Sequence, residues 1–157
     1  MYDTMESLMA GGANPLFASF VDTGLERGPA LAKDIAWFES EGLKAAPASG
    51  AGAEYAAVLR GLAASDPPAF LCHWYNVYFA HSAGGRMIGS QVGKTLALSR
   101  ELAFYLYQGE MADHLAAVRE KINQVAEQWS REEKDHCLAE TAKSFELSGK
   151  LLRCIAE

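Results

Sequence analysis

The sequence predicts an all-α protein that forms a single domain over residues 1–157, and three observations support this prediction. Apolar residues recur at intervals of three and four along several segments, as on one face of an α-helix. No segment alternates apolar and polar residues in the way that a half-buried strand does. Half of the residues are apolar and 22% are charged, which suits one globular domain with its own core.

The first part of the chain predicts three helical segments. Residues 1–10 have the character of the last turns of a helix, because two glycines and Pro15 follow. Helices are also predicted over residues 29–41 and 55–64, and the Ala-, Gly- and Pro-rich segment 45–53 between them is expected to be a loop. In the helix over 29–41 we expect inward apolar and outward charged side chains, respectively Ile35, Trp37 and Phe38, and Lys33, Asp34, Glu39 and Glu41.

A long helix is predicted over residues 67–98. Ser65 or Asp66 can cap its first turn, and the prolines that follow suit the first helical positions. Its interior contains several glycines, each of which costs roughly 1 kcal/mol relative to alanine: Gly84, Gly85, Gly89 and Gly93. The last three recur every four residues and share a face. Such a run predicts a bend. It favours either tight packing there or the close approach of a flat group to the backbone.

Two further helices are predicted towards the C-terminus. Residues 111–129 carry an apolar stripe with helical spacing, which predicts one face in the core: Met111, Leu115, Val118, Ile122, Val125 and Trp129. Residues 132–156 repeat this rhythm and are expected to form the last helix, with Leu138, Thr141, Phe145, Ser148, Leu152 and Ile155 on one face.

Charge and composition exclude several classes of function. A net charge of −6 and a pI near 5.2 argue against binding to nucleic acid or to anionic membranes. The longest apolar run, near residues 70–80, is interrupted by His73 and Asn76, so membrane insertion is not expected. The cysteines are three in number, and no two are spaced as Cys-x-x-Cys, which argues against a zinc site or a redox dithiol. We expect reduced, partly buried thiols.

The most distinctive run is Phe79-Ala80-His81-Ser82-Ala83-Gly84-Gly85-Arg86-Met87-Ile88-Gly89. It resembles the distal helix of plant-type and cyanobacterial heme oxygenases. Further stretches resemble successive parts of the plastid enzymes in the same order: residues 2–6, 23–27, 33–38, 118–126, 129–134 and 136–145. Because the resemblance is collinear over nearly the whole chain, it is far more specific than any single motif.

This resemblance implies a heme oxygenase-like helical bundle with a glycine-kinked distal helix. It implies oxidative opening of heme, as both cofactor and substrate, to biliverdin, carbon monoxide and ferrous iron. O2 and reduced ferredoxin would be consumed, and a bilin reductase is a possible downstream partner. A monomer in the plastid stroma is expected. In the family, a histidine on a helix upstream of the stretch at residues 2–6 holds the heme iron. The sequence contains no match to that histidine, so we expect an N-terminally incomplete chain with no metal ligand of its own.

The resemblance also implies the site residues. Gly84 and Gly85 match the distal glycines next to the iron, and His81 would order water near the bound oxygen. The propionate edge of heme would meet Tyr75, Arg119 and Lys121, and the pocket would be walled by Phe145 and Ser148. Of the remaining histidines, His73 is expected to be a satisfied core residue, whereas His114 and His136 are expected to be exposed.

Two other functions fit parts of the sequence. Because the proximal histidine is absent, the chain is alternatively a porphyrin- or bilin-binding protein without turnover. A di-iron site is suggested by the Glu-x-x-His pattern of Glu133 and His136, but such sites need a second pair, and the sequence has none.

Overall fold

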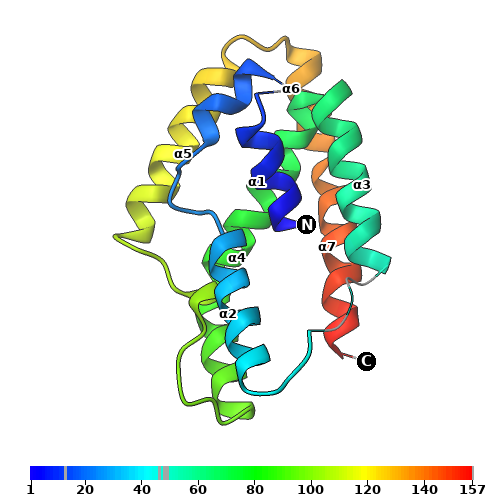
Figure 1. Cartoon of the computed structure of the whole chain (residues 1–157). Coiled ribbons are helices and arrows are strands. Elements are labelled where there is room, and N and C mark those ends of the chain that lie inside the picture. The colour runs from blue at the N-terminus through cyan, green and yellow to red at the C-terminus, as the bar shows by residue number, and fades with distance from the viewer. Residues whose placement is uncertain (13, 46, 48–49, 157) are drawn as a thin grey trace.

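The computed structural model describes residues 1–12, 14–45, 47 and 50–156, and every regular element in this part of the chain is helical (Figure 1). The fold class is therefore all-α, as predicted. The elements are α1 (Tyr2–Ala10), η1 (Pro15–Phe20), α2 (Gly28–Ser40), α3 (Gly50–Ser65), α4 (Pro67–Thr95), η2 (Ala103–Tyr105), α5 (Met111–Ala126), α6 (Arg131–Ala139) and α7 (Thr141–Ala156). No helix in the described ranges is both long and apolar enough to cross a membrane.

Several predicted boundaries are wrong. The helices predicted to end at residues 98 and 129 end at Thr95 and Ala126, and two differences are larger. The loop expected over 45–53 ends early, because α3 already begins at Gly50; alanines favour a helix once its later residues pack in the core. Residues 46, 48 and 49 lie outside the described part. The single helix expected over 132–156 is two helices, α6 and α7, which meet in a turn at Glu140. The Glu140 carboxylate accepts a hydrogen bond from the buried His73 of α4 at 3.0 Å, which ties this turn to the core. The side chain of Ile155 is also outside the described part.

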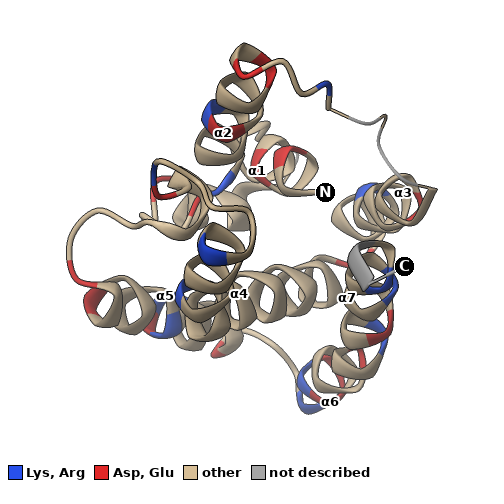
Figure 2. Cartoon of the chain, turned by 90° about the horizontal axis from the view of Figure 1, so that it is seen from below, with Lys and Arg blue, Asp and Glu red and all other residues tan. Residues whose placement is uncertain are grey.

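The helix α4 runs through the centre of the molecule. Asp66 caps it by accepting a hydrogen bond from the Ala69 amide at 3.2 Å, and two prolines occupy its first positions. Its buried residues all lie between Ala69 and Gly85. Figure 2 shows the first part of α4 running across the view and its later part turning towards the viewer, so the helix bends as the glycines predict.

The core forms where α4 meets α1, α3 and η1. Ring contacts join η1 to α4: the centroids of Phe17 and Phe70 lie 4.8 Å apart, and those of Phe20 and Trp74 lie 5.5 Å apart. The 3-10 turn η1 is capped by Asn14, whose side chain accepts a hydrogen bond from the Leu16 amide. It was not predicted, because six residues are too few to show a periodic pattern.

Glu6 of α1 connects three helices. Its carboxylate accepts hydrogen bonds from the Arg27 amide at 2.7 Å, the Gly28 amide at 2.9 Å and the Tyr78 hydroxyl at 2.7 Å. The first two amides open α2 and have no partner within that helix. A β-carbon on Gly28 would lie 2.6 Å from carboxylate oxygens of Glu6 and of Asp3, so a larger residue there would have to displace these carboxylates. The start of α2 is thus held against α1 and α4.

Asp34 contradicts the predicted orientation of α2. It was expected to be exposed but is 3% exposed, whereas Ile35, which was expected to be inward, is 38% exposed. The Asp34 carboxylate accepts hydrogen bonds from the amides of Ala103 and Phe104 at 2.8 and 2.7 Å, and from Arg100 at 3.0 Å. These partners are distant in sequence, which explains why the amphipathic pattern of α2 does not reveal them. Asp34 fixes η2 against the rest of the fold.

Candidate functional site

The glycines of α4 face different surroundings. A β-carbon on Gly85 would lie 3.2 Å from the His81 ring, and one on Gly89 would lie 2.6 Å from Cγ of Tyr105 in η2. A β-carbon on Gly84 would meet only the end of Ile88 at 3.9 Å, and one on Gly93 would meet nothing within 4 Å. Gly85 and Gly89 therefore serve close packing against the chain itself, whereas the backbone of α4 lies open at Gly84 and at Gly93.

These glycines provide a matched pair for a stability measurement. Gly89→Ala places a methyl group against the base of Tyr105, which cannot rotate away, and we expect a net loss of about 1–2 kcal/mol in the free energy of unfolding. Gly93→Ala removes a helix-interior glycine in open space and should gain about 0.5–1 kcal/mol. Urea unfolding followed by circular dichroism measures both changes. Equal effects of the two substitutions would contradict the packing role of Gly89.

His81 points towards η2. Its Nε2 donates a hydrogen bond to the Phe104 carbonyl at 2.9 Å. Its ring centroid lies 4.4 Å from that of Phe104 and 5.6 Å from that of Tyr105. Burial lowers the pKa of His81, so the neutral ring is favoured. The structure brings His81 together with Gly85 but places its ring on the side of the helix that η2 covers.

One face of α4, which we call the open stripe, consists of Asn76, Ala80, Gly84 and Met87 and begins beside α7. Asn76 donates a hydrogen bond to the Ser144 hydroxyl at 2.8 Å, so this face of α4 is directed at α7. Steps of three and four residues lead from Asn76 to Ala80, Gly84 and Met87, and Met87 is 76% exposed. On α7, the residue after Ser144 is Phe145, which is 58% exposed. Gly84 and Phe145 thus belong to helix faces that leave apolar surface uncovered.

Tyr75 and Arg119 line one cavity of about 340 Å³ between α4, α5 and α6. The Tyr75 ring stacks on Phe79 at a centroid distance of 3.9 Å, and the Arg119 guanidinium lies 4.9 Å from the centre of the same ring. Phe79 therefore holds an aromatic hydroxyl and a cation in fixed positions. Lys121, two residues after Arg119 and therefore on another side of α5, does not line this cavity.

Ser148 lies near a chain of hydrogen bonds in the interior. The Tyr55 hydroxyl bonds to Nδ1 of His73 at 2.8 Å, and Nε2 of His73 bonds to Glu140 at 3.0 Å. Ser148 of α7 is close enough to Tyr55 to influence the pKa of its hydroxyl. Burial lowers the pKa of His73, so the neutral ring donates from Nε2 to the carboxylate and accepts from Tyr55 at Nδ1. The prediction that His73 is a satisfied core histidine is confirmed. Sequence reasoning missed Tyr55 and Glu140, which lie on other helices.

The other two histidines, His136 and His114, also form hydrogen bonds. His136 is half exposed and bonds to Asp66 at 2.6 Å, which raises its pKa. His114 was expected to be exposed but is half-buried, because its ring packs against Gly24 while Nε2 donates to the Gln108 carbonyl at 2.7 Å. None of the four histidines is shown facing Gly84. The described residues also contain no group of three or more His, Cys, Asp or Glu side chains that could hold a metal ion.

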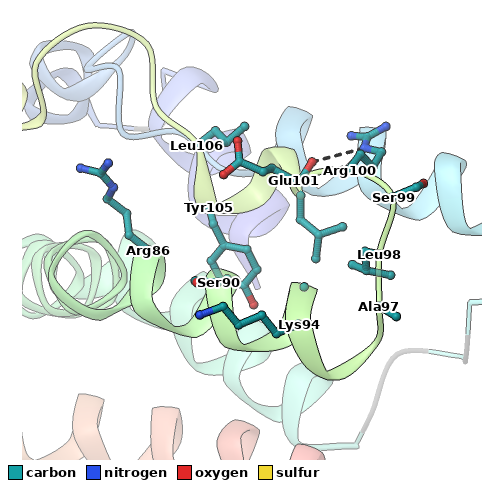
Figure 3. A pocket seen from close by; sticks show the side chains of 13 residues that line it. Arg86, Ser90, Lys94, Ala97, Leu98, Ser99, Arg100, Glu101, Tyr105 and Leu106 are labelled. Carbon is teal, nitrogen blue, oxygen red and sulfur yellow. Dashed lines mark hydrogen bonds between the residues drawn. The ribbon is translucent and has the colours of Figure 1, made fainter.

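A second, larger hollow of about 680 Å³ lies between the end of α4 and the segment leading to η2 (Figure 3). Figure 3 shows the charged ends of Arg86, Lys94 and Arg100 pointing in different directions, and Arg100 is already paired with Asp34. These cations do not converge on one point. The hollow therefore lacks the arrangement that would bind a compact anion.

Comparisons with known proteins identify the family. Residues 1–154 match the sequence model of the family described as Heme oxygenase. The chain is 49% identical over 155 residues to Heme oxygenase 3, chloroplastic, of Arabidopsis thaliana, covering 99% of the chain and 54% of that protein. It is 40% identical to the Probable inactive heme oxygenase 2, chloroplastic, of the same plant, covering 99% of the chain and 52% of that protein. The chain thus spans about half the length of the curated relatives it matches.

A solved structure has the same fold. Heme oxygenase-1 from the cyanobacterium Synechocystis sp. PCC6803, in complex with heme, superposes with a TM-score of 0.67 at 23% sequence identity. The match covers 99% of this chain and 75% of that one. At this identity the likeness supports the fold alone, whereas the sequence matches are closer and extend over nearly every residue. The chain belongs to the heme oxygenase family.

Proposed function

We propose that this chain binds heme and takes part in its oxidative opening to biliverdin, carbon monoxide and ferrous iron. The observation that carries the proposal is the open backbone at Gly84, on a face of α4 that leaves apolar surface uncovered beside α7. A flat apolar disc needs such an approach, with polar groups at one edge only. Family membership supports the same function.

In this proposal heme meets the chain at its disc face and at its polar edge. Gly84, with Gly85 behind it, would let the disc lie close to α4, and Phe145 and Ser148 of α7 would wall the pocket. Arg119 and Tyr75 would hold the propionates, because a guanidinium can grip a carboxylate with two hydrogen bonds and a phenol with one. Lys121 does not line the cavity of Arg119 and Tyr75, so we assign it no contact with heme.

When bound, heme supplies both the iron at which O2 is reduced and the ring that is opened. The chain's own residues orient the ring and exclude water. His81 would hold α4 against η2 through its bond to Phe104, and through water it would help to place a proton on the distal side. No axial ligand is assigned, because none of the four histidines is shown facing Gly84.

The finer parts of this function rest on the family. We propose reduced ferredoxin as the electron donor, a bilin reductase as a downstream partner, the plastid stroma as the location and a monomeric state. The chloroplastic relatives support the plastid. A second candidate is porphyrin or bilin binding without turnover. It is favoured by the engagement of the four histidines and by the relative named as probably inactive.

A hemin titration of Gly84→Leu tests the proposal. Because space is open at Gly84, the variant should keep the parent's helicity and melting temperature, yet the new side chain would occupy the disc face. We expect hemin affinity to fall by about tenfold or more, equivalent to about 1.4 kcal/mol. Gly93→Leu, also in open space, is the matched control and should bind hemin like the parent.

Adding reduced ferredoxin and O2 then separates the two candidates. Biliverdin formation from the bound hemin supports the enzyme. Hemin and metal-free porphyrin binding equally well, with no biliverdin, would support the non-enzymatic candidate. Unchanged hemin affinity in Gly84→Leu would overturn the assigned binding face.

A further inference from the structure

The backbone of Phe104 in η2 is held on both of its polar groups. Its amide donates to the Asp34 carboxylate at 2.7 Å, and the neighbouring amide of Ala103 donates to the same carboxylate at 2.8 Å. The Phe104 carbonyl accepts a hydrogen bond from Nε2 of His81 at 2.9 Å and another from Arg27 at 3.3 Å. One residue of η2 therefore connects a buried carboxylate of α2 to the histidine ring of α4.

The bond to a carbonyl decides which nitrogen of His81 carries the proton. A carbonyl oxygen can only accept, so Nε2 is the protonated nitrogen. Burial lowers the pKa of His81, so the ring is neutral at pH 7. A neutral imidazole has a single N–H group, and Nδ1 is therefore left with a lone pair that can accept a hydrogen bond.

This acceptor lies next to the glycines of α4. A β-carbon on Gly85 would lie 3.2 Å from Cε1 and 3.4 Å from Nδ1 of His81, so the ring covers the backbone at this glycine. Nδ1 has no hydrogen-bond partner in the part of the chain that the structure describes. In the same part, the Tyr107 hydroxyl is the one fully buried side-chain polar atom without a partner, so Nδ1 is in contact with solvent.

Asp34 is the charged group that fixes Phe104 in this position. Its side chain is buried, and hydrogen bonds from amides to a carboxylate are roughly twice as strong as bonds between neutral groups. The rings of His81 and Phe104 also touch, with centroids 4.4 Å apart, but a ring contact does not select one nitrogen over the other. The choice between the two nitrogens depends on the direction of the Phe104 carbonyl.

We propose that Asp34 is a positioning residue for His81: through the backbone of Phe104 it keeps the ring proton on Nε2 and leaves Nδ1 as an acceptor beside Gly85. A water molecule that donates one hydrogen to Nδ1 has its second O–H available for a group bound over Gly84. This last consequence rests on the proposed function, in which His81 helps to place a proton on the distal side.

Heteronuclear NMR of the full chain with isotope-labelled histidine nitrogens tests the inference without heme, and His81→Gln assigns the signals. For the parent we expect a single Nε2–H tautomer of His81, with an Hε2 proton that exchanges slowly enough to be observed. In Asp34→Asn, one carboxylate oxygen becomes an NH2 group that cannot accept from a backbone amide. The Hε2 signal should then be lost, and the pKa of His81 should rise towards its ordinary value of 6.5 as water reaches the ring.

Arg100→Gln is the matched control. It removes the ion pair that Arg100 forms with Asp34 at 3.0 Å but leaves both backbone amides bonded to the carboxylate. His81 should therefore keep the tautomer and the Hε2 signal of the parent. Circular dichroism confirms that both variants are folded. A proton on Nδ1 in the parent, or identical His81 spectra in Asp34→Asn and the parent, would overturn the inference.

Turnover provides a second measurement, which rests on the proposed function. With reduced ferredoxin and O2, Asp34→Asn should bind hemin like the parent but form biliverdin about tenfold more slowly or less, because misplacing a positioned group by about 1 Å can cost a hundredfold in rate. Equal rates would refute the part of His81 in placing the proton. Because the NMR measurement needs no hemin, a wrong tautomer refutes this inference alone, and failure of hemin binding in the parent refutes only the proposed function.

Discussion

Glu6→Ala should lower the free energy of unfolding by about 2–4 kcal/mol, the largest loss that we expect from a single polar side chain in this fold. The Glu6 carboxylate accepts hydrogen bonds from the opening amides of α2 and from the Tyr78 hydroxyl. Tyr78 is 0% exposed, so no solvent reaches it to replace the lost partner. An unpaired buried hydroxyl costs about 1–3 kcal/mol, and the loss of a helix cap costs about 1 kcal/mol more.

Urea denaturation followed by circular dichroism at pH 7 measures the effect. Glu39→Ala is the matched control, because Glu39 lies exposed on α2 and its carboxylate has no hydrogen-bond partner among the described residues. It should change stability by less than about 0.5 kcal/mol. Glu6→Gln keeps one accepting oxygen and should lose about half as much as Glu6→Ala. A loss below about 1 kcal/mol in Glu6→Ala would show that the three helices meet without this carboxylate.

His73→Phe should destabilise the protein by about 3 kcal/mol at pH 7.5, and by less at pH 5.5. The ring of His73 is 0% exposed and satisfies both the Tyr55 hydroxyl and the Glu140 carboxylate. Phenylalanine fills the volume but pairs with neither group. The Tyr55 hydroxyl and the Glu140 carboxylate then lose their hydrogen bonds to this ring.

The pH dependence follows from the sign of the shift. Burial lowers the pKa of His73 in the folded state below its ordinary value of 6.5. Between these two pKa values the unfolded chain binds a proton that the folded chain does not, so the parent loses stability as the pH falls below about 6.5. The variant lacks this loss. The difference between parent and variant should therefore shrink in acid, and a difference that stays constant would contradict the neutral state of His73.

His136 is a control in which the pKa is shifted in the opposite direction to that of His73. Its hydrogen bond to Asp66 raises its pKa, so its contribution is present below pH 6.5 and is lost as the pH rises through the folded pKa. Stability curves of His136→Ala and of the parent, measured over the same pH range, should diverge in acid. This is the reverse of the behaviour of His73→Phe.

The sequence predicted the features of this fold that depend on local pattern. The apolar stripe of α5 is correct in position, and the capped start of α4 and its bend follow from Asp66, the prolines and the glycines. The turn at Glu140 was missed because it depends on His73, a partner from another helix. Asp34 was misplaced for the same reason, since its partners are backbone amides beyond α4.

In the candidate site, too, some features could be predicted from the sequence and others depend on contacts between distant segments. The cavity joins Tyr75 to Arg119, and both were singled out from the family resemblance. The different surroundings of Gly84 and Gly89 could not be predicted, because they depend on where Tyr105 packs. The spacing of residues predicts which of them share one face of a helix. It does not predict which other helix packs against that face.

The distribution of burial along α4 makes one continuous helix behave as two cooperative units. Every buried residue of this helix lies at or before Gly85, and beyond that point the backbone is held mainly by Tyr105 and by the η2 segment that Asp34 anchors. Amides in the first unit can exchange their hydrogens with solvent only when the whole core unfolds, whereas those in the second are released when η2 lifts away. The end of α4 can therefore open and close on its own timescale while the core that supports Gly84 remains folded.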